Sequence, residues 1–207
     1  MTTFLAQLLL AYLLGALSGS LLLGRFRGVD IRKAGSGNAG ATNALRTQGW
    51  RFALGVLLFD VGKGVVAVLL IGRLQAESLP AWLTPHVALA CGLMAAIGHC
   101  WPVWHGFRGG KGAGTLFGGY AVLYPWAALI AFGGWVLCLL ATGYVGLSTL
   151  VGGFTLLVAM ASLGATVVPL VLTAAGALLL VWTHRANLER LRRGTESRFE
   201  KVRLLRW

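Results

Sequence analysis

The sequence predicts an all-α polytopic membrane protein, a compact bundle of about seven transmembrane helices, several of them short. Its 207 residues are 57% hydrophobic and only 12% charged, which is about half the charged share of an ordinary soluble domain. Long apolar runs alternate with connections that carry most of the 18 Lys and Arg residues, and the net charge is +12. We expect residues 1–207 to form a single integral membrane domain.

The same composition excludes several classes of function. A soluble nucleic-acid-binding protein can be this basic, but it could not also hide this much apolar surface, so we expect no nucleic acid as a partner. The 6 Asp and Glu residues leave little for hard-cation sites, which disfavours an acid-rich metal enzyme. The cysteines Cys91, Cys100 and Cys138 lack a framework spacing. We therefore expect no disulfide, no metal and no cofactor.

Three apolar segments precede the middle of the chain, and each is close to the length of about 20 residues that a helical crossing needs. Residues 1–24 carry no charge and lack both a basic start and a small-residue cleavage site, which indicates a retained span rather than a signal peptide. The second span is 52–72, and the third is about 82–100. Asp60 and Lys63 lie inside the second span, where ionisable groups are costly unless paired. Their i, i+3 spacing predicts a structural pair.

The longest feature is an uncharged stretch of 72 residues from Gly112 to Thr183. Basic residues gather in 25–51, 101–112 and 184–207, so the positive-inside rule places these segments in the cytoplasm and the N-terminus outside. Both ends of the uncharged stretch then lie on one side, which requires an even number of crossings. We predict four crossings of about 15–18 residues each, and seven helices in all. The alternative is two crossings with a re-entrant turn, which would make five helices in all.

Prolines and glycine pairs are expected to interrupt the uncharged stretch. They are Pro125, Pro169 and the pairs at 118–119, 133–134 and 152–153. Small residues four apart, such as Gly15 with Gly19 and Gly114 with Gly118, are typical of helices that pack closely in lipid.

A first polar cluster, Gly35-Ser-Gly-Asn-Ala-Gly-Ala-Thr-Asn43, lies in the first basic connection and is followed by Arg46. It matches G-x-G-x-x-G, but its flanks are membrane spans rather than a strand and a helix of a dinucleotide-binding unit. What remains is local chemistry. The glycines permit a left-handed backbone that forms an anion-binding nest, and Arg46 can clamp a phosphate with two hydrogen bonds.

A second polar cluster runs from Gly98-His99 to Phe107-Arg-Gly-Gly-Lys111-Gly. A Walker A motif is excluded, because Gly112 follows the lysine where Ser or Thr should stand. The cluster still combines two cations with a backbone that can approach a ligand closely, which is suited to phosphate.

A third polar cluster, His184-Arg-Ala-Asn187-Leu-Glu-Arg-Leu, begins where the last span leaves the membrane and continues to Gly194-Thr-Glu196. His184 and Asn187 lie on one helical face at i, i+3, and the i, i+4 spacing of Glu189 and Arg193 predicts an ion pair. The remaining arginines are expected as positive-inside charges against anionic lipid.

These three clusters, in this order, resemble the motifs of the bacterial membrane glycerol-3-phosphate acyltransferases that use acyl phosphate as donor. The resemblance covers nearly the whole chain and includes the Asp60-Val-Gly-Lys63-Gly step. One departure is Arg108, which stands where the family often has lysine. The resemblance implies transfer of a fatty acyl group to the first hydroxyl of sn-glycerol 3-phosphate. The products are lysophosphatidic acid and phosphate, in the first step of phospholipid synthesis.

Motifs and resemblance together imply a set of site residues. We expect acyl phosphate to contact Ser36, Asn38, Thr42, Asn43, Arg46 and Ser148. We expect glycerol 3-phosphate to contact His99, Arg108, Gly109, Gly110, Lys111 and Gly112. The residues expected to take part in catalysis are Ser36, Lys111, His184 and Asn187. A structural role is expected for Asp60, Lys63 and Glu196, with Glu196 holding the tail against a basic loop.

The resemblance also places the protein in the bacterial cytoplasmic (inner) membrane, with several crossings, membrane lipid around it and the active site facing the cytoplasm. Either His184 or a substrate phosphate oxygen takes the proton of the attacking hydroxyl. A small membrane carrier or channel for phosphorylated anions is the alternative function. The oligomeric state stays open, and a monomer is compatible with the sequence.

Overall fold

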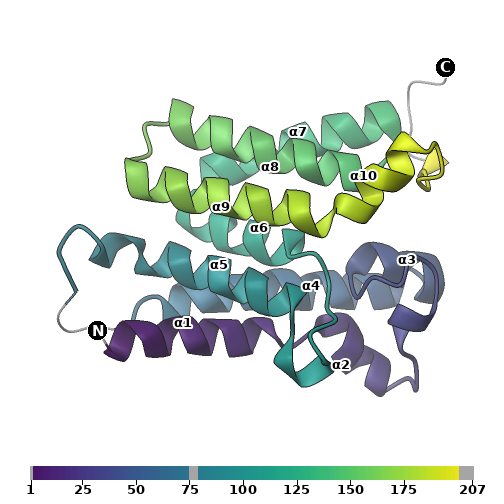
Figure 1. Cartoon of the computed structure of the whole chain (residues 1–207), viewed down its shortest axis with the longest axis horizontal. Helices are drawn as coiled ribbons and strands as arrows, with labels where there is room; N and C mark the ends of the chain where they lie inside the picture. Colours follow the sequence, from purple (N-terminus) through teal and green to yellow (C-terminus); the bar gives the residue numbers. More distant parts are fainter. Residues whose placement is uncertain (1, 75–78, 201–207) are drawn as a thin grey trace. The chain divides into compact units, whose positions relative to one another are not determined.

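The computed structural model describes residues 2–74 and 79–200, and in these ranges the regular structure is entirely helical (Figure 1). The α-helices are α1 (Thr2–Gly15), α2 (Gly19–Arg25), α3 (Ala41–Gln48), α4 (Trp50–Val66), α5 (Val87–Cys100), α6 (Ala113–Leu123), α7 (Pro125–Thr142), α8 (Val145–Ser162), α9 (Val167–Thr183) and α10 (Arg185–Arg192). A π-helical turn, η2 (Ala67–Ile71), extends α4. Short 3-10 turns are η1 (Ile31–Lys33), η3 (Thr84–His86) and η4 (Val103–His105).

The helix lengths confirm an all-α membrane protein. Among the described residues, 4 helices are long and apolar enough to cross a membrane, and up to 6 if each of two bent helix pairs is one span. The helix Ala113–Leu123 is apolar but shorter. The uncharged stretch holds four helices, α6 to α9, as predicted. The first of them has 11 residues, fewer than expected.

The predicted first span, 1–24, is not one continuous helix but a bent pair. It consists of α1 and α2, which meet at an angle of 48°. The second predicted span is confirmed, because α4 and η2 together run from Trp50 to Ile71. The cause of the break in the first span lies in the buried charges of the second, as described below.

The glycine pairs do not interrupt the uncharged stretch, contrary to the prediction. The pairs at 118–119, 133–134 and 152–153 lie inside α6, α7 and α8. Pro125 begins α7, and Pro169 lies in the first turn of α9, where a missing N–H costs no helical hydrogen bond. Proline therefore marks helix starts, whereas the glycines remain available for packing.

The chain divides into two compact units, Met1–Leu123 and Tyr124–Trp207. In the first unit, α1 packs against α5 and α4 packs against α6 (Figure 1). These contacts are close because glycine lies at the crossings. A Cβ atom on Gly15 would overlap the backbone of Ala95, and one on Gly118 would overlap the backbone of Val61. The predicted role of small residues in packing is confirmed at these two positions.

In the second unit, α7 packs against α8 and α8 packs against α9, so helices that follow one another in sequence are neighbours in space (Figure 1). Gly143 ends α7 in the left-handed conformation, and its amide donates to the Leu139 carbonyl at 2.7 Å. The short helix α10 follows α9 at a bend of 53° and contacts both α8 and α9. This bend places His184 and Asn187 at the end of α9, where α10 contacts α8.

The substitution Gly118→Ala tests the glycine contact between α6 and α4. The new methyl group would overlap the Val61 backbone, which cannot turn aside as a side chain can. We expect a loss of about 2 kcal/mol in the free energy of unfolding, measured by thermal unfolding in detergent micelles. Gly62→Ala is the matched control, because a Cβ there meets no atom within 4 Å. Equal stability of the two variants would contradict this packing.

Candidate active site

Asn43 shapes the first polar cluster from within. Its Nδ2 donates to the carbonyls of Ile31 at 2.9 Å and Ala34 at 3.0 Å, and its Oδ1 accepts from the Ser36 amide at 2.9 Å. The side chain is only 1% exposed. Both amide protons are thus used to fold residues 31–36 around the start of α3. The expected contact of Asn43 with acyl phosphate stays a prediction.

Gly35 is required at the closest point of this loop. Its φ of +60° lies in the left-handed region, and a Cβ there would overlap Asn43 Oδ1. The tight turn leaves Ser36 exposed, with Asn38 and Thr42 half-buried. Arg46 lies one turn further along α3 and is exposed. The first cluster therefore presents small polar groups together with a cation.

The second polar cluster folds back on the end of α5. The Gly110 amide donates to the His99 carbonyl at 3.0 Å, and the Gly109 amide donates to the Cys100 carbonyl at 3.2 Å. These bonds satisfy carbonyls that the end of a helix leaves without partners. Two amides that could have held a phosphate are therefore occupied by α5. Lys111 is half-buried and Arg108 is exposed at the same loop.

Arg32 joins the two clusters within the first unit. Its Nη1 donates to the carbonyls of His105 and Arg108, both at 3.1 Å. Asp30 holds the other edge of the guanidinium at 2.8 Å, and the hydrogen bond from Arg32 keeps the pKa of Asp30 below its ordinary value of 3.8. Because the pKa is lowered, this pair persists at neutral pH and is lost only as the pH falls through that pKa. No sequence motif includes Arg32, so its role could not be predicted from a motif.

A buried group of three ionisable side chains lies beneath these loops. Lys63 Nζ lies 3.1 Å from Asp60 Oδ1 and 2.7 Å from His99 Nδ1, and all three residues are no more than 5% exposed. The predicted Asp60–Lys63 pair is confirmed. His99, expected near glycerol 3-phosphate, is the unforeseen third member.

The same charges account for the break between α1 and α2. In an unbroken helix the Gly19 amide would donate to the Gly15 carbonyl. Instead, the Gly19 amide donates to Asp60 Oδ1 at 3.2 Å, and the Gly15 carbonyl accepts from Lys63 Nζ at 2.8 Å. A second carbonyl at the break, that of Leu17, also accepts from Lys63 Nζ, at 3.0 Å. The ion pair thus satisfies both groups of the missing helical hydrogen bond: Lys63 donates to the Gly15 carbonyl, and Asp60 accepts from the Gly19 amide.

In the second unit, His184 is buried at the end of α9. Its Nδ1 lies 2.8 Å from the Leu180 carbonyl oxygen. A carbonyl can only accept, so Nδ1 carries the proton, and the neutral ring has its lone pair on Nε2. Ser148, also buried, donates its hydroxyl to the Tyr144 carbonyl at 2.8 Å within α8.

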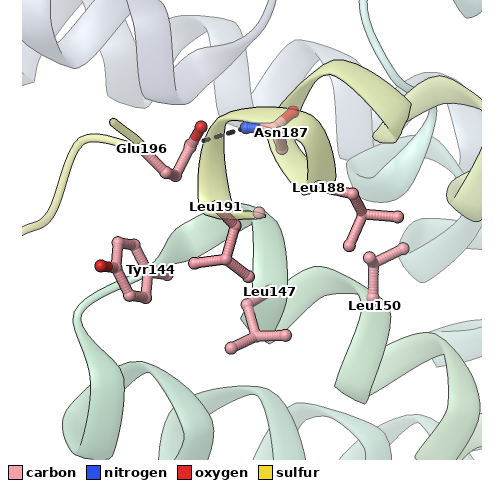
Figure 2. A pocket seen from close by; sticks show the side chains of 8 residues that line it. Tyr144, Leu147, Leu150, Asn187, Leu188, Leu191 and Glu196 are labelled. Carbon is pink, nitrogen blue, oxygen red and sulfur yellow. Dashed lines mark hydrogen bonds between the residues drawn. The ribbon is translucent and has the colours of Figure 1, made fainter. Parts of the chain in front are cut away.

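Glu196 holds the side chain of Asn187, which is one of the residues predicted to take part in catalysis (Figure 2). Asn187 Nδ2 donates to Glu196 Oε1, and Arg190 Nε donates to Glu196 Oε2, each at 2.7 Å. Glu196 was expected to hold the tail against a basic loop, and its basic partner is instead Arg190 on α10. The predicted Glu189–Arg193 pair is present as well, at 2.6 Å. Figure 2 shows Asn187 turned to Glu196 above a pocket lined by Tyr144, Leu147, Leu188 and Leu191.

The helices and polar loops define an integral membrane protein with cation-rich clusters suited to phosphate groups. Similarity to known proteins identifies the family within this class of membrane proteins. The sequence profile of the glycerol-3-phosphate acyltransferase family matches residues 5–194. The chain belongs to this family, and it is a glycerol-3-phosphate acyltransferase.

Two relatives and two solved structures illustrate the similarity. The chain is 45% identical to a glycerol-3-phosphate acyltransferase of Thermus thermophilus over 198 residues, 96% of each chain. It is 43% identical to glycerol-3-phosphate acyltransferase 1 of Deinococcus radiodurans over 201 residues, 97% of this chain and 98% of the other. The crystal structures are of PlsY (YgiH), an integral membrane glycerol 3-phosphate acyltransferase. Its glycerol 3-phosphate form has a TM-score of 0.87 at 32% identity, and its lysophosphatidic acid form has 0.84 at 31%, each covering 96% of both chains. Family membership favours the enzyme over the carrier alternative.

The substitution Arg32→Ala tests the link between the two clusters. It removes the donors to the carbonyls of His105 and Arg108, each hydrogen bond being worth about 1 kcal/mol. We expect the amides of 105–109 to exchange with deuterium about 30-fold faster, as for a loss of about 2 kcal/mol. Hydrogen exchange followed by mass spectrometry measures this rate. Lys33→Ala is the control, because Lys33 is exposed beside Arg32. Unchanged exchange in Arg32→Ala would show that the link does not order the loop.

Proposed function

We propose that this protein transfers a fatty acyl group from acyl phosphate to the first hydroxyl of sn-glycerol 3-phosphate. The products are lysophosphatidic acid and inorganic phosphate. The reaction takes place at the cytoplasmic face of the bacterial cytoplasmic membrane and begins phospholipid synthesis. The proposal refines the family's glycerol-3-phosphate acyltransferase activity by naming the donor, the side of the membrane and the chemical route.

The observation that supports an acyl phosphate donor is the joining of two cation-bearing loops in the first unit. Arg32 ties the loop after Ile31 to the loop before Lys111 through backbone carbonyls. Each loop carries a cation and small polar groups or glycines, which suits one phosphate each. Acyl phosphate and glycerol 3-phosphate are both phosphate anions, so a pair of such loops matches a pair of such substrates.

Acyl phosphate chemistry also needs little from the enzyme. The donor is an activated mixed anhydride, so no covalent enzyme nucleophile is required. The glycerol hydroxyl oxygen bonds to the acyl carbonyl carbon, the carbon–oxygen bond to phosphate breaks, and inorganic phosphate leaves. Positioning and charge stabilisation supply most of the acceleration in such a reaction.

The proposed roles follow the polarity of each group. Direct contacts to acyl phosphate come from Ser36, Asn38, Thr42 and Arg46. Contacts to glycerol 3-phosphate come from His99, Arg108, Lys111 and the Gly112 backbone, while Gly109 and Gly110 shape the loop through their bonds to α5. The predicted contacts of Asn43 and Ser148 with acyl phosphate stay predictions, and their donors bond to backbone carbonyls of their own segments. Asn187 polarises the acyl carbonyl, and Glu196 orients the Asn187 amide.

His184 is the proposed base. Its Nδ1 proton is directed at the Leu180 carbonyl, so Nε2 carries the lone pair that can take the hydroxyl proton. The alternative is a phosphate oxygen of the substrate as base, with His184 orienting the hydroxyl.

The donor is tested with purified protein in micelles or liposomes. We expect turnover with palmitoyl phosphate and glycerol 3-phosphate, followed by phosphate release and by extraction of the lipid product. Palmitoyl-CoA in place of palmitoyl phosphate should give no lysophosphatidic acid. Product from palmitoyl-CoA alone would contradict the proposed donor and leave the family activity intact.

The substitution His184→Ala tests the proposed base. General base catalysis contributes about 10²–10⁴-fold, so we expect kcat to fall by at least about 100-fold. His86→Ala is the control, because His86 lies in η3, outside the polar clusters. A kcat of His184→Ala close to that of the unaltered protein would assign the proton to a substrate phosphate oxygen instead.

A further inference from the structure

The buried His99 ring contacts the first unit on two sides. On one side its Nδ1 lies 2.7 Å from Lys63 Nζ. On the other side its Nε2 faces the Gly109–Gly112 loop so closely that a Cβ on Gly110 would overlap it. Gly110 is therefore the residue that lets this ring nitrogen reach the loop. The loop is the one proposed above to bind the phosphate of glycerol 3-phosphate, and the inference below rests on that proposal.

The contacts of Lys63 determine where the proton of His99 lies. An ammonium group has three protons and no lone pair, so every partner of Lys63 Nζ must accept. Its three hydrogen-bond partners, one for each proton, are the carbonyls of Gly15 and Leu17 and His99 Nδ1, and Asp60 Oδ1 lies 3.1 Å away as the opposite charge. His99 Nδ1 is also 3.4 Å from Asp60 Oδ1, but its contact with Lys63 Nζ is much shorter, at 2.7 Å, and sets the tautomer. Asp60 neutralises the charge of Lys63 inside the helices. His99 Nδ1 therefore carries the lone pair, and the ring proton is on Nε2, the nitrogen that faces Gly110.

A phosphate bound at the Gly109–Gly112 loop would need a hydrogen-bond donor such as His99 Nε2. Gly109 and Gly110 point their amides at carbonyls of α5, so those two protons bond within the protein. A phosphate bound at the loop must take its hydrogen bonds from other groups. His99 Nε2 lies against Gly110 in the same loop, so its proton needs no reorganisation when ligand arrives.

We infer that Lys63 and Asp60 are positioning residues: they hold the proton of His99 on Nε2 and direct that N–H to the Gly109–Gly112 loop as a fixed hydrogen-bond donor for glycerol 3-phosphate. This goes beyond the mutual neutralisation of Asp60 and Lys63. The pair sets the chemical state of a ligand-binding group on another helix.

The first test is spectroscopic and needs no substrate. Long-range proton–nitrogen NMR of the ¹⁵N-histidine-labelled protein in micelles distinguishes the two ring tautomers, and the His99 signals are those missing from His99→Gln. We expect Nε2 to be protonated and Nδ1 to be unprotonated. A proton on Nδ1 overturns the inference, whatever the enzyme's acyl donor.

A double variant, Asp60→Asn with Lys63→Met, removes both charges and keeps similar volumes. We expect the His99 signals to change to a mixture of tautomers. An unchanged Nε2-protonated signal in this variant would show that Lys63 does not set the proton.

The second test uses two replacements of His99 and binding of glycerol 3-phosphate, measured by isothermal titration without any acyl donor. Glutamine can place an amide N–H near the position of Nε2, whereas the shorter asparagine places its amide near Nδ1. We expect His99→Gln to keep Kd within about threefold, and His99→Asn to weaken it by about tenfold or more, as for loss of a hydrogen bond to a charged group. Equal effects of the two variants overturn the donor role. Because no acyl donor is present, failure of the proposed acyl phosphate chemistry leaves this result unaffected.

Discussion

The first unit depends on a buried ammonium group, that of Lys63 on α4. A charge this far from water is tolerated only when neighbouring groups compensate for it. Asp60 supplies the opposite charge one turn away, and the carbonyls of Gly15 and Leu17 supply acceptors. The acceptors exist because the first apolar segment breaks at this point. The break in one span and the charge in another therefore stabilise each other, and neither is a defect of the helical pattern.

Two histidines illustrate how the neighbour of one ring nitrogen sets the chemistry of the other. His99 Nδ1 contacts an ammonium, so its Nε2 carries the proton and can donate. His184 Nδ1 contacts a carbonyl, so its Nε2 carries the lone pair and can accept. One residue is thus suited to hold a phosphate and the other to take a proton. The same side chain can fill two proposed roles because each surrounding backbone or side chain fixes a different tautomer.

Much of the fold could be predicted from apolar run lengths, because a membrane protein must satisfy its backbone within helices. The four helices between Gly112 and Thr183 follow from this constraint and from the charges at either end. The break after Gly15 could not be predicted, since the residues that satisfy it lie more than forty positions away on α4. Glycine pairs were misassigned as interruptions because glycine marks both turns and close helix contacts, and the sequence alone does not separate the two.

The site was predictable to a similar degree. The three motifs indicated which segments carry polar groups suited to phosphate, and the pairing of Asp60 with Lys63 followed from their spacing. The contacts of Arg32 with the second loop, and of Lys63 with His99, join residues that share no motif. Asn43 is predicted to contact acyl phosphate because it is polar and lies in a motif, and the structure adds that its amide protons bond to the loop that it folds. Polar residues in a tight loop can shape the loop or contact a ligand, and only the geometry distinguishes these roles.

The central claim is that the phosphate of the donor leaves as the acyl carbonyl is attacked. Palmitoyl phosphate with ¹⁸O in the bridging oxygen, reacted with glycerol 3-phosphate, tests this most directly, with ³¹P NMR of the released phosphate as the readout. Attack at the carbonyl carbon predicts that every released phosphate carries one ¹⁸O atom, in an amount equal to the lysophosphatidic acid formed. Unlabelled phosphate, or phosphate released without that lipid product, would contradict the account.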